Sequence, residues 1–355
     1  MLSAILACPT RPCLSNMTPV RIPQIGSLPV SRLFAIQILI IQILVIVVGT
    51  GLPRPVWAEP ATDSLTHSAT AQDPPRPPAW GQAELAGLIT DSKLSEISGL
   101  VASRRHADTL WVHNDSGDGP VLHAMSYQGE RRATLTLENT GSRDWEDMAG
   151  FRLDGREYLL IADTGDNGGL RSTLSLHIIA EPDQIADART TPAWSIHFRW
   201  PDGPRDCEAV AVDVQAGIVL LIGKKRSPPD LFSLPLRPND DRIQTAEPIG
   251  LLAGIVQPTA EDLRRNPRFG RYRSQITGAD LDDSGLLLAV LNYRSAHVYP
   301  RRPGESWGTA VARAPIEIPF PWLPQAEAIG FDAQGTLWIA SEQRPAPLLR
   351  LPRRH

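Results

Sequence analysis

Cysteine is nearly absent from this sequence. Of the three cysteines, Cys8 and Cys13 lie close to the N-terminus, in a segment with the pattern of a targeting sequence, and only Cys207 remains beyond it. No internal disulfide can therefore form in the remainder, and its stability must come from packing. Cys207 precedes Glu208 but lacks the sequence context of a nucleophile, so we expect an inert buried thiol.

The sequence also lacks an excess of charge of either sign. Its 35 basic and 39 acidic residues give a formal net charge of −4, which provides no electrostatic argument for binding nucleic acid. The 33 prolines are spread along the chain and argue against long uninterrupted helices. The hydrophobic content of 42% is that of a globular protein with ample material for a core.

Local catalytic motifs are missing as well. The sequence contains no H-E-x-x-H, no P-loop and no dinucleotide-binding fingerprint. Its histidines are scattered, which argues against zinc. The stretch SEISGL contains serine and glycine, but it is not the G-x-S-x-G elbow of hydrolases.

One long apolar run is present, at residues 33–48. Arginines precede it and the small-residue sequence VWA, ending at Ala58, follows it. This pattern predicts that residues 1–58 are a signal peptide or an N-terminal membrane anchor, with cleavage after Ala58 favoured and translation from Met17 as an alternative start. We therefore expect a periplasmic or secreted protein, with anchorage to the inner membrane through residues 33–48 as the alternative. Residues 59–79 are rich in proline and polar residues and are predicted to be a disordered linker.

The rest of the chain, residues 80–355, contains a weak repeat. Five segments begin alike: SEISGLVAS, WEDMAGFRL, CEAVAVDV, ITGADLDD and AEAIGFDA. Four of them carry a glutamate at the second position, namely Glu96, Glu146, Glu208 and Glu327, and the remaining one has Thr277. A recurring opening at intervals of this size predicts a repeat architecture.

Further short apolar runs follow each opening and read as strands. Examples are YLLIADTGDN, LSLHIIAEP and WSIHFRWP in the second unit. Three runs recur in every unit, and a fourth run is visible in the first three units. Four strands to a unit predict an all-β propeller with four-stranded blades, in which five blades are favoured over six. The orphan strand at residues 83–90 is expected to complete the last blade and close the ring. A β-sandwich is the alternative, but it does not explain the recurring glutamate.

The propeller topology predicts where the polar residues gather. In a meander, the start of the first strand and the end of the second strand lie on the same rim of the central channel, where loops carry function on a rigid scaffold. Carboxylates there suit calcium, a hard cation that takes six to eight oxygen ligands. The predicted metal ligands are Glu96, Glu146, Asp147, Asp163, Asp166, Glu208 and Glu327.

Basic residues on the same rim are candidates for holding an anionic group. The predicted substrate-binding residues are Lys224, Lys225, Arg294 and Arg344. Two alternatives stay open. The glutamates can instead tie neighbouring blades together through backbone amides. The Asp/Asn/Gly stretches at residues 113–119 and 162–169 fit either calcium loops without a bidentate glutamate or tight turns.

The stretches DWEDMAG, DCEAVAV, HNDSG and ADTGDN resemble a broad group of secreted bacterial β-propellers over residues 80–355. The group includes phytase-like and esterase-like proteins and, more distantly, the gluconolactonase-type and NHL propellers. In the phytases, calcium ions and basic side chains hold a phosphorylated substrate. The resemblance implies metal-binding roles for Glu146, Glu208, Glu327, Asp163 and Asp166, and phosphate-binding roles for Lys224, Lys225 and Arg294. The predicted five blades depart from the six blades of phytases and gluconolactonases.

Two functions follow as hypotheses. In the first, an exported monomeric propeller with a calcium-binding rim binds or hydrolyses a small anionic, phosphoester-like ligand, with Glu146 or Glu208 as the general base. In the second, the same rim of a non-catalytic envelope scaffold binds a protein or a glycan. Neither hypothesis includes nucleic acid as a partner, and contact with a membrane would be only through an uncleaved N-terminal segment.

Overall fold

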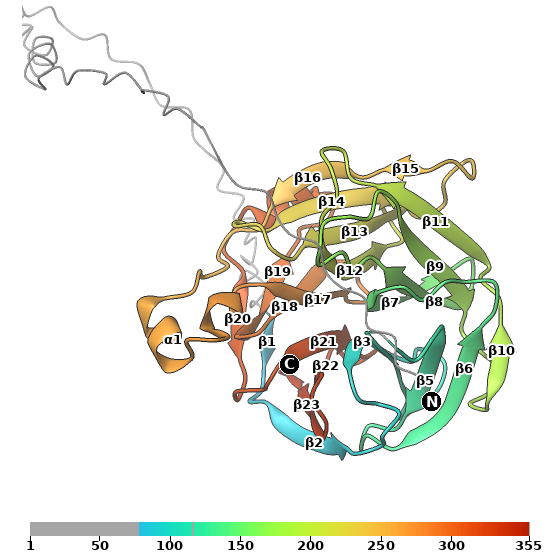
Figure 1. The fold of residues 1–355 in the computed structure, drawn as a ribbon, viewed down its shortest axis with the longest axis horizontal. Coiled ribbons are helices and arrows are strands. Elements are labelled where there is room, and N and C mark those ends of the chain that lie inside the picture. Colours follow the sequence, from blue (N-terminus) through green and yellow to red (C-terminus); the bar gives the residue numbers. More distant parts are fainter. Residues whose placement is uncertain (1–77, 116, 355) are drawn as a thin grey trace, which may run out of the picture. The chain divides into compact units, whose positions relative to one another are not determined.

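The computed structural model describes residues 78–115 and 117–354, and in them five antiparallel sheets surround a common centre (Figure 1). The prediction of a five-bladed β-propeller is confirmed. The predicted signal peptide or anchor at residues 1–58 and all but the last two residues of the predicted linker lie outside the described residues.

Blades 1 and 2 are four-stranded meanders to which a fifth, short strand adds in parallel. Blade 1 contains β3 (Ile97–Ala102), β4 (Leu110–Asn114), β5 (Val121–Met125), β6 (Arg131–Leu137) and the added β10 (Ala188–Thr190). Blade 2 contains β7 (Trp145–Leu153), β8 (Arg156–Asp163), β9 (Leu174–Ala180), β11 (Trp194–Arg199) and the added β15 (Gln244–Thr245). Each added strand comes from a later part of the chain and covers a sheet edge that would otherwise be open for pairing.

Blades 3, 4 and 5 have four strands each. Blade 3 contains β12 (Cys207–Asp213), β13 (Ile218–Gly223), β14 (Asp230–Pro235) and β16 (Glu247–Leu251). Blade 4 contains β17 (Ile276–Leu281), β18 (Leu287–Asn292), β19 (Ser295–Pro300) and β20 (Ile316–Pro319). Blade 5 contains β21 (Ala326–Phe331), β22 (Leu337–Ser341), β23 (Ala346–Leu351) and β2 (Glu84–Ile89).

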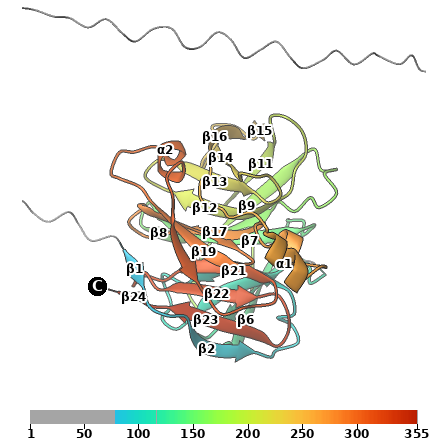
Figure 2. The same cartoon turned by 90° about the vertical axis from the view of Figure 1, so that its left-hand side faces the viewer.

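The ring closes between the two ends of the described chain. Strand β2 pairs with β23 as the outermost strand of blade 5, as the sequence predicts for residues 83–90. A second, two-stranded sheet joins β1 (Ala79–Trp80) to β24 (Arg353–Arg354) (Figure 2). Because blade 5 contains strands from both ends, it cannot form until the whole propeller sequence is available.

The extended interval between blades 3 and 4 does not contain a sixth blade. It holds α1 (Ala260–Arg265) and the 3-10 helix η1 (Gly270–Tyr272), and Figure 1 shows α1 projecting beyond the blades. Thr259 caps α1 in a capping box with Asp262. A second short helix, α2 (Trp307–Val311), lies in the connection between β19 and β20. The interval is therefore a connection between two blades, in keeping with five blades rather than six.

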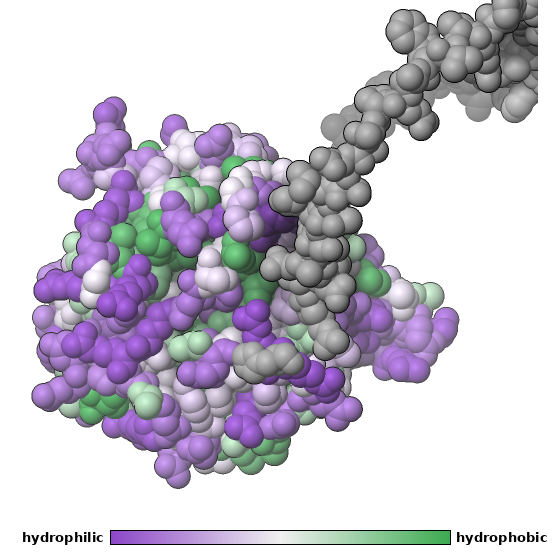
Figure 3. All heavy atoms as spheres, turned by 180° about the vertical axis from the view of Figure 1, so that it is seen from behind, coloured by the Kyte–Doolittle hydropathy of each residue, from purple (hydrophilic) through white to green (hydrophobic). Residues whose placement is uncertain are grey.

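The innermost strands explain how the centre is filled. Strands β3, β12, β17 and β21 are buried along their whole length and contact their neighbours around the ring, with β7 completing the circle. Apolar clusters fill the space between adjacent blades, so the propeller is held by packing rather than by disulfides, and Cys207 is a buried free thiol. On the face shown in Figure 3, hydrophilic residues predominate and hydrophobic ones show mainly in recessed areas between them.

A buried carboxylate in β17 makes a prediction about pH. Asp280 is 2% exposed and accepts a hydrogen bond from the Phe331 amide at 2.8 Å. Burial raises its pKa from 3.8 to about 7, although the nearby Arg104 charge opposes the shift. Since the folded state then binds a proton that the unfolded state has released, stability from Asp280 is complete below pH 3.8 and is lost as the pH rises to 7.

In the parent protein, Asp280 lowers the free energy of unfolding by at most about 1.4 kcal/mol per pH unit between pH 4 and 7. We therefore expect this fall to be absent from Asp280→Asn. At pH 8 the variant should be more stable by about 2 kcal/mol, because loss of the attraction to Arg104 offsets part of the gain. Urea unfolding across this pH range measures both. An unchanged pH dependence in the variant would show that Asp280 ionises normally.

Candidate functional site

The same irregularity begins the innermost strand of every blade. In each, the pairing with the second strand skips one residue after the first pair, for example between Trp145 and Asp147. Such a β-bulge turns the skipped side chain in a direction of its own. The skipped residues are Ser98, Glu146, Glu208, Thr277 and Glu327, which we call the bulge ring.

This register corrects the sequence alignment of blade 1. Ser98, not Glu96, is the equivalent of Glu146, so the predicted equivalence of Glu96 with the other glutamates is wrong by two residues. Glu96 is exposed and belongs instead to the position just before the strand. That second set, which we call the entry ring, consists of Glu96, Asp144, Asp206, Gln275 and Gln325.

The bulge ring has two kinds of member. The hydroxyl groups of Ser98 and Thr277 donate hydrogen bonds to backbone carbonyls of the next blade, at Glu146 and Ala326. These two residues tie blades together, whereas the alternative interpretation gave that role to the glutamates through backbone amides. The three glutamates make no such backbone bond in the described chain, so their carboxylates are available for the channel mouth.

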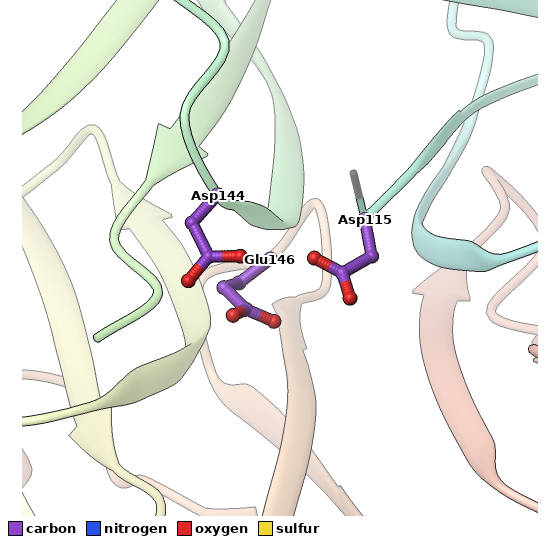
Figure 4. Close-up of side chains that lie close together, drawn as sticks. All are labelled: Asp115, Asp144 and Glu146. Carbon is purple, nitrogen blue, oxygen red and sulfur yellow. The ribbon is translucent and has the colours of Figure 1, made fainter. Parts of the chain in front are cut away.

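Carboxylates from the two rings, together with Asp115 after β4, meet in two groups of three. The Asp144 triad contains Asp115, Asp144 and Glu146, and the Glu208 triad contains Glu146, Asp206 and Glu208. In each triad, one oxygen from every residue lies within 4.8 Å of the other two. Figure 4 shows the Asp144 triad, in which Asp115 after β4, Asp144 before β7 and Glu146 in β7 turn their carboxylates toward one another.

The proximity of these acids raises the pKa values of their carboxyl groups. Burial raises the pKa of Glu146 well above its ordinary value, and the charge of Asp115 raises it further. Burial and the charge of Asp144 raise the pKa of Asp115 to about 7. Burial also raises the pKa of Asp144. Repulsion among buried carboxylates that only a cation relieves is typical of a functional site.

Two lysines supply part of that relief. The Lys224 ammonium contacts Glu208 Oε1, and its charge also lowers the pKa of Glu146, Glu327 and Glu342. Lys225 pairs with Asp206 at 2.8 Å and donates to the Asn167 carbonyl at 3.1 Å. Both lysines therefore lie at this mouth of the channel, as predicted.

The fifth blade contributes Glu327 to the same mouth. Its carboxylate accepts a hydrogen bond of 2.6 Å from the Tyr293 hydroxyl. Burial raises the pKa of Glu327 to about 7, while Lys224 and Tyr293 oppose the shift. Burial and the carboxylate of Glu327 also raise the pKa of the Tyr293 phenol. Glu327 lies on the rim, but it belongs to neither triad.

Asp163 and Asp166 have structural partners. Asp163 forms a buried ion pair of 2.7 Å with Arg171. Asp166 accepts hydrogen bonds from the Leu170 and Arg171 amides, and its own amide donates to Asp206 Oδ1 at 2.8 Å. The carboxylates of Asp163 and Asp166 are therefore engaged by neighbouring protein groups, and the Asp166 amide positions Asp206.

Asp147 lies deeper than the predicted rim. Its side chain is fully buried and accepts hydrogen bonds from three backbone amides, those of Met148, Val210 and Ala279. The last two belong to β12 and β17, so this carboxylate links three blades inside the channel. Burial raises its pKa well above the ordinary value. The structure places Asp147 in neither triad.

The two predicted arginines lie apart from the triads. Arg294 reaches Asp262 of α1 at 3.5 Å, and Arg344 is exposed on the loop between β22 and β23. Sequence reasoning also left Asp115, Asp144 and Asp206 out of the predicted ligands. The signal that finds Asp144 and Asp206 is the entry ring, because an acidic residue two positions before a bulge glutamate recurs in blades 2 and 3. Asp115 follows β4 and has no such signal.

The opposite mouth of the channel has a different character. A cavity of about 370 Å³ lies there, at the far ends of the innermost strands. Its charged lining is mixed, since Arg104 pairs with Asp283 at 2.7 Å and Arg152 lies 3.5 Å from Glu157. The concentration of like charge is at the mouth that carries the triads.

The fold and this mouth define the class: a five-bladed β-propeller with a buried acidic cluster able to hold a metal ion. No protein-family model and no curated protein matches the sequence. Solved structures with a similar fold include a luciferin-regenerating enzyme, at 10% identity, covering 78% of this chain and 95% of that chain with a TM-score of 0.40. Another is a structural genomics protein of unknown function from Bacteroides thetaiotaomicron, at 12% identity, covering 78% and 76% with a TM-score of 0.40. In the described residues, no helix has the length and apolar character needed to cross a membrane.

Proposed function

We propose that the acidic mouth binds calcium and, with it, binds and hydrolyses a small anionic ligand of the phosphoester type. The observation that carries the proposal is the convergence of five carboxylates in two triads, three of them buried and two half-buried, with only two lysines paired to them in the described chain. Carboxylate oxygens are the ligands that calcium prefers, and its flexible coordination suits a site assembled from three blades.

The residues at the mouth have separate roles in this proposal. Bound calcium would polarise the ligand and lower the pKa of an attached water molecule. Glu146 and Glu208 would hold the ion. A carboxylate oxygen of either residue that does not bind the ion would serve as the general base. Lys224 and Lys225 lie beside Glu208 and Asp206, where their ammonium groups attract an incoming anion. Arg294 and Arg344 are not part of this proposal.

The cellular setting is part of the same proposal. The N-terminal sequence pattern supports export to the periplasm or the medium, where free calcium is available to a site of moderate affinity. We propose that the exported protein acts as a monomer. The non-catalytic alternative uses the same mouth to hold a protein or a glycan.

Thermal melts with calcium and with a chelator test the proposal. At free calcium a hundred times the dissociation constant, binding should add about 2.7 kcal/mol to the free energy of unfolding. For a domain of this size that corresponds to a rise of roughly 5–10 °C in Tm. The same preparations are assayed against phosphoesters, carboxylic esters and lactones.

The outcomes separate the hypotheses. A calcium-dependent rise in Tm with phosphoester turnover supports the proposal. A rise in Tm without turnover of any substrate favours the scaffold. Identical melts in calcium, magnesium and chelator would contradict a cation site at this mouth.

A further inference from the structure

The two triads share one residue, Glu146. Calcium–oxygen distances are about 2.3–2.6 Å, so oxygens on opposite sides of one ion lie up to about 5 Å apart. The three oxygens of either triad, all within 4.8 Å of one another, therefore fit around a single ion. Glu146 has two carboxylate oxygens and belongs to both triads, with Asp115 and Asp144 in one and with Asp206 and Glu208 in the other.

The Glu146 carboxylate has no interaction partner in the described chain. Its side chain is only 4% exposed, and within the described chain it forms no hydrogen bond or ion pair. Leaving a buried carboxylate without partners costs free energy unless a ligand completes it. Glu208 adds a fully buried oxygen to the cluster, since it is 2% exposed and its Oε2 has no hydrogen-bond partner in the described chain.

The backbone opposite Glu146 leaves room for this carboxylate and for little else. A Cβ atom at Gly165 would lie 2.1 Å from Glu146 Oε1 and 2.4 Å from Asp144 Oδ2. Gly165 therefore allows both carboxylates to approach the loop after β8 in their observed positions. Any larger residue at 165 would displace the two acids that define the Asp144 triad.

We propose that Glu146 bridges two calcium ions, one in the Asp144 triad and one in the Glu208 triad. This inference rests on the proposed calcium site and specifies its composition. A bridging carboxylate holds two cations about 3.5–4 Å apart, a spacing that lets both act on one phosphoryl group.

The triads differ in whether a cation must break existing ion pairs in order to bind. In the described part of the chain, neither Asp115 nor Asp144 pairs with a basic side chain, so an ion enters that triad without competition. Glu208 and Asp206 pair with Lys224 and Lys225. A cation in the Glu208 triad must displace or repel these ammonium groups, so we infer that it binds second and more weakly.

Calcium titration by calorimetry tests the proposal on the intact protein. The expected isotherm has two steps, and the dissociation constant of the second step should be at least about 10-fold larger. This factor corresponds to about 1.4 kcal/mol of repulsion between the second ion and the two lysines. Asp115→Asn should remove the tighter step and Glu208→Gln the weaker one, while Glu146→Gln weakens both. Glu96→Gln, an entry-ring carboxylate outside both triads, is the control for loss of charge and should keep both steps.

Manganese, which also prefers oxygen ligands, reports the bridge directly. Electron paramagnetic resonance of the protein with two Mn²⁺ should show the exchange-coupled spectrum of a bridged pair, and Glu208→Gln should leave the spectrum of one isolated ion. Gly165→Ala should weaken both calcium-binding steps, as Glu146→Gln does, by displacing Asp144 and the shared Glu146. Circular dichroism and melting of each variant show whether it is folded.

The results separate this inference from the function on which it rests. One calcium per chain, or two uncoupled Mn²⁺ ions, would overturn the bridge and leave a mononuclear site intact. No calcium binding at all would overturn both. Two steps that survive Glu146→Gln unchanged would place the second ion elsewhere.

Discussion

Alanine at both Glu146 and Glu208 is expected to reduce phosphoester turnover by about 1,000-fold or more, because it removes metal ligands and the general base together. The propeller should still fold. Both side chains emerge at bulges where, in the described chain, they make no backbone hydrogen bond, and their removal relieves repulsion among buried carboxylates. Initial rates in saturating calcium, with circular dichroism of the same samples, measure the two effects.

A matched control removes the same charge from the same rim. Glu96 and Glu342 are rim carboxylates outside both triads, so alanine at both positions should leave turnover within a few-fold of the parent protein. If the control variant loses as much activity as the triad variant, the loss of turnover results from removing negative charge anywhere on the rim and not from the triads. If the triad variant keeps its turnover, the placement of the chemistry at Glu146 and Glu208 is wrong.

Asp147→Ala is expected to lower the free energy of unfolding by about 4 kcal/mol. The variant leaves the amides of Met148, Val210 and Ala279 without their acceptor, at about 1–3 kcal/mol each. Removing a fully buried carboxylate whose pKa is raised offsets only part of this loss. For a domain of this size, the loss corresponds to a fall of roughly 8–16 °C in Tm.

Asp147→Asn separates the hydrogen bonds from the charge. The amide oxygen of asparagine can still accept from Val210 and Ala279, which share one oxygen of Asp147, so we expect a loss of about 1 kcal/mol, from the Met148 amide alone. Urea unfolding of both variants gives the comparison. A loss below 1 kcal/mol in Asp147→Ala would mean that water replaces the carboxylate in the channel. Calcium affinity should stay unchanged in Asp147→Asn, because Asp147 lies in neither triad.

The local sequence was sufficient to predict most of the fold. The recurring openings, the strand triplets after them and the orphan strand at residues 83–90 indicated a five-bladed ring closed by its N-terminal strand. This succeeds because each blade is a meander of neighbouring strands, so its pairings are local. The short strands β1, β10, β15 and β24 went unpredicted, since each is two or three residues long and pairs outside the meander of its own blade.

The site was predicted only in outline. Glu146, Glu208 and Lys224 were placed correctly at one mouth of the channel, because strand direction alone decides which end of a blade they occupy. Asp163, Asp166 and Asp147 have the same residue type and similar sequence positions, yet they bond an arginine, a turn and three backbone amides. A carboxylate in the sequence carries no sign of which of these partners it will meet.

What the sequence by itself determined is the repeat and therefore the architecture, since strand periodicity and turn residues act over a few residues. What only the tertiary structure decided is the composition of the site. The bulge shifts blade 1 by two residues, so that Ser98 replaces Glu96 in the bulge ring. It also brings Asp115 of blade 1, Glu146 of blade 2 and Glu208 of blade 3 into one cluster. These contacts span more than 90 residues, and their geometry depends on ring closure, which no local pattern encodes.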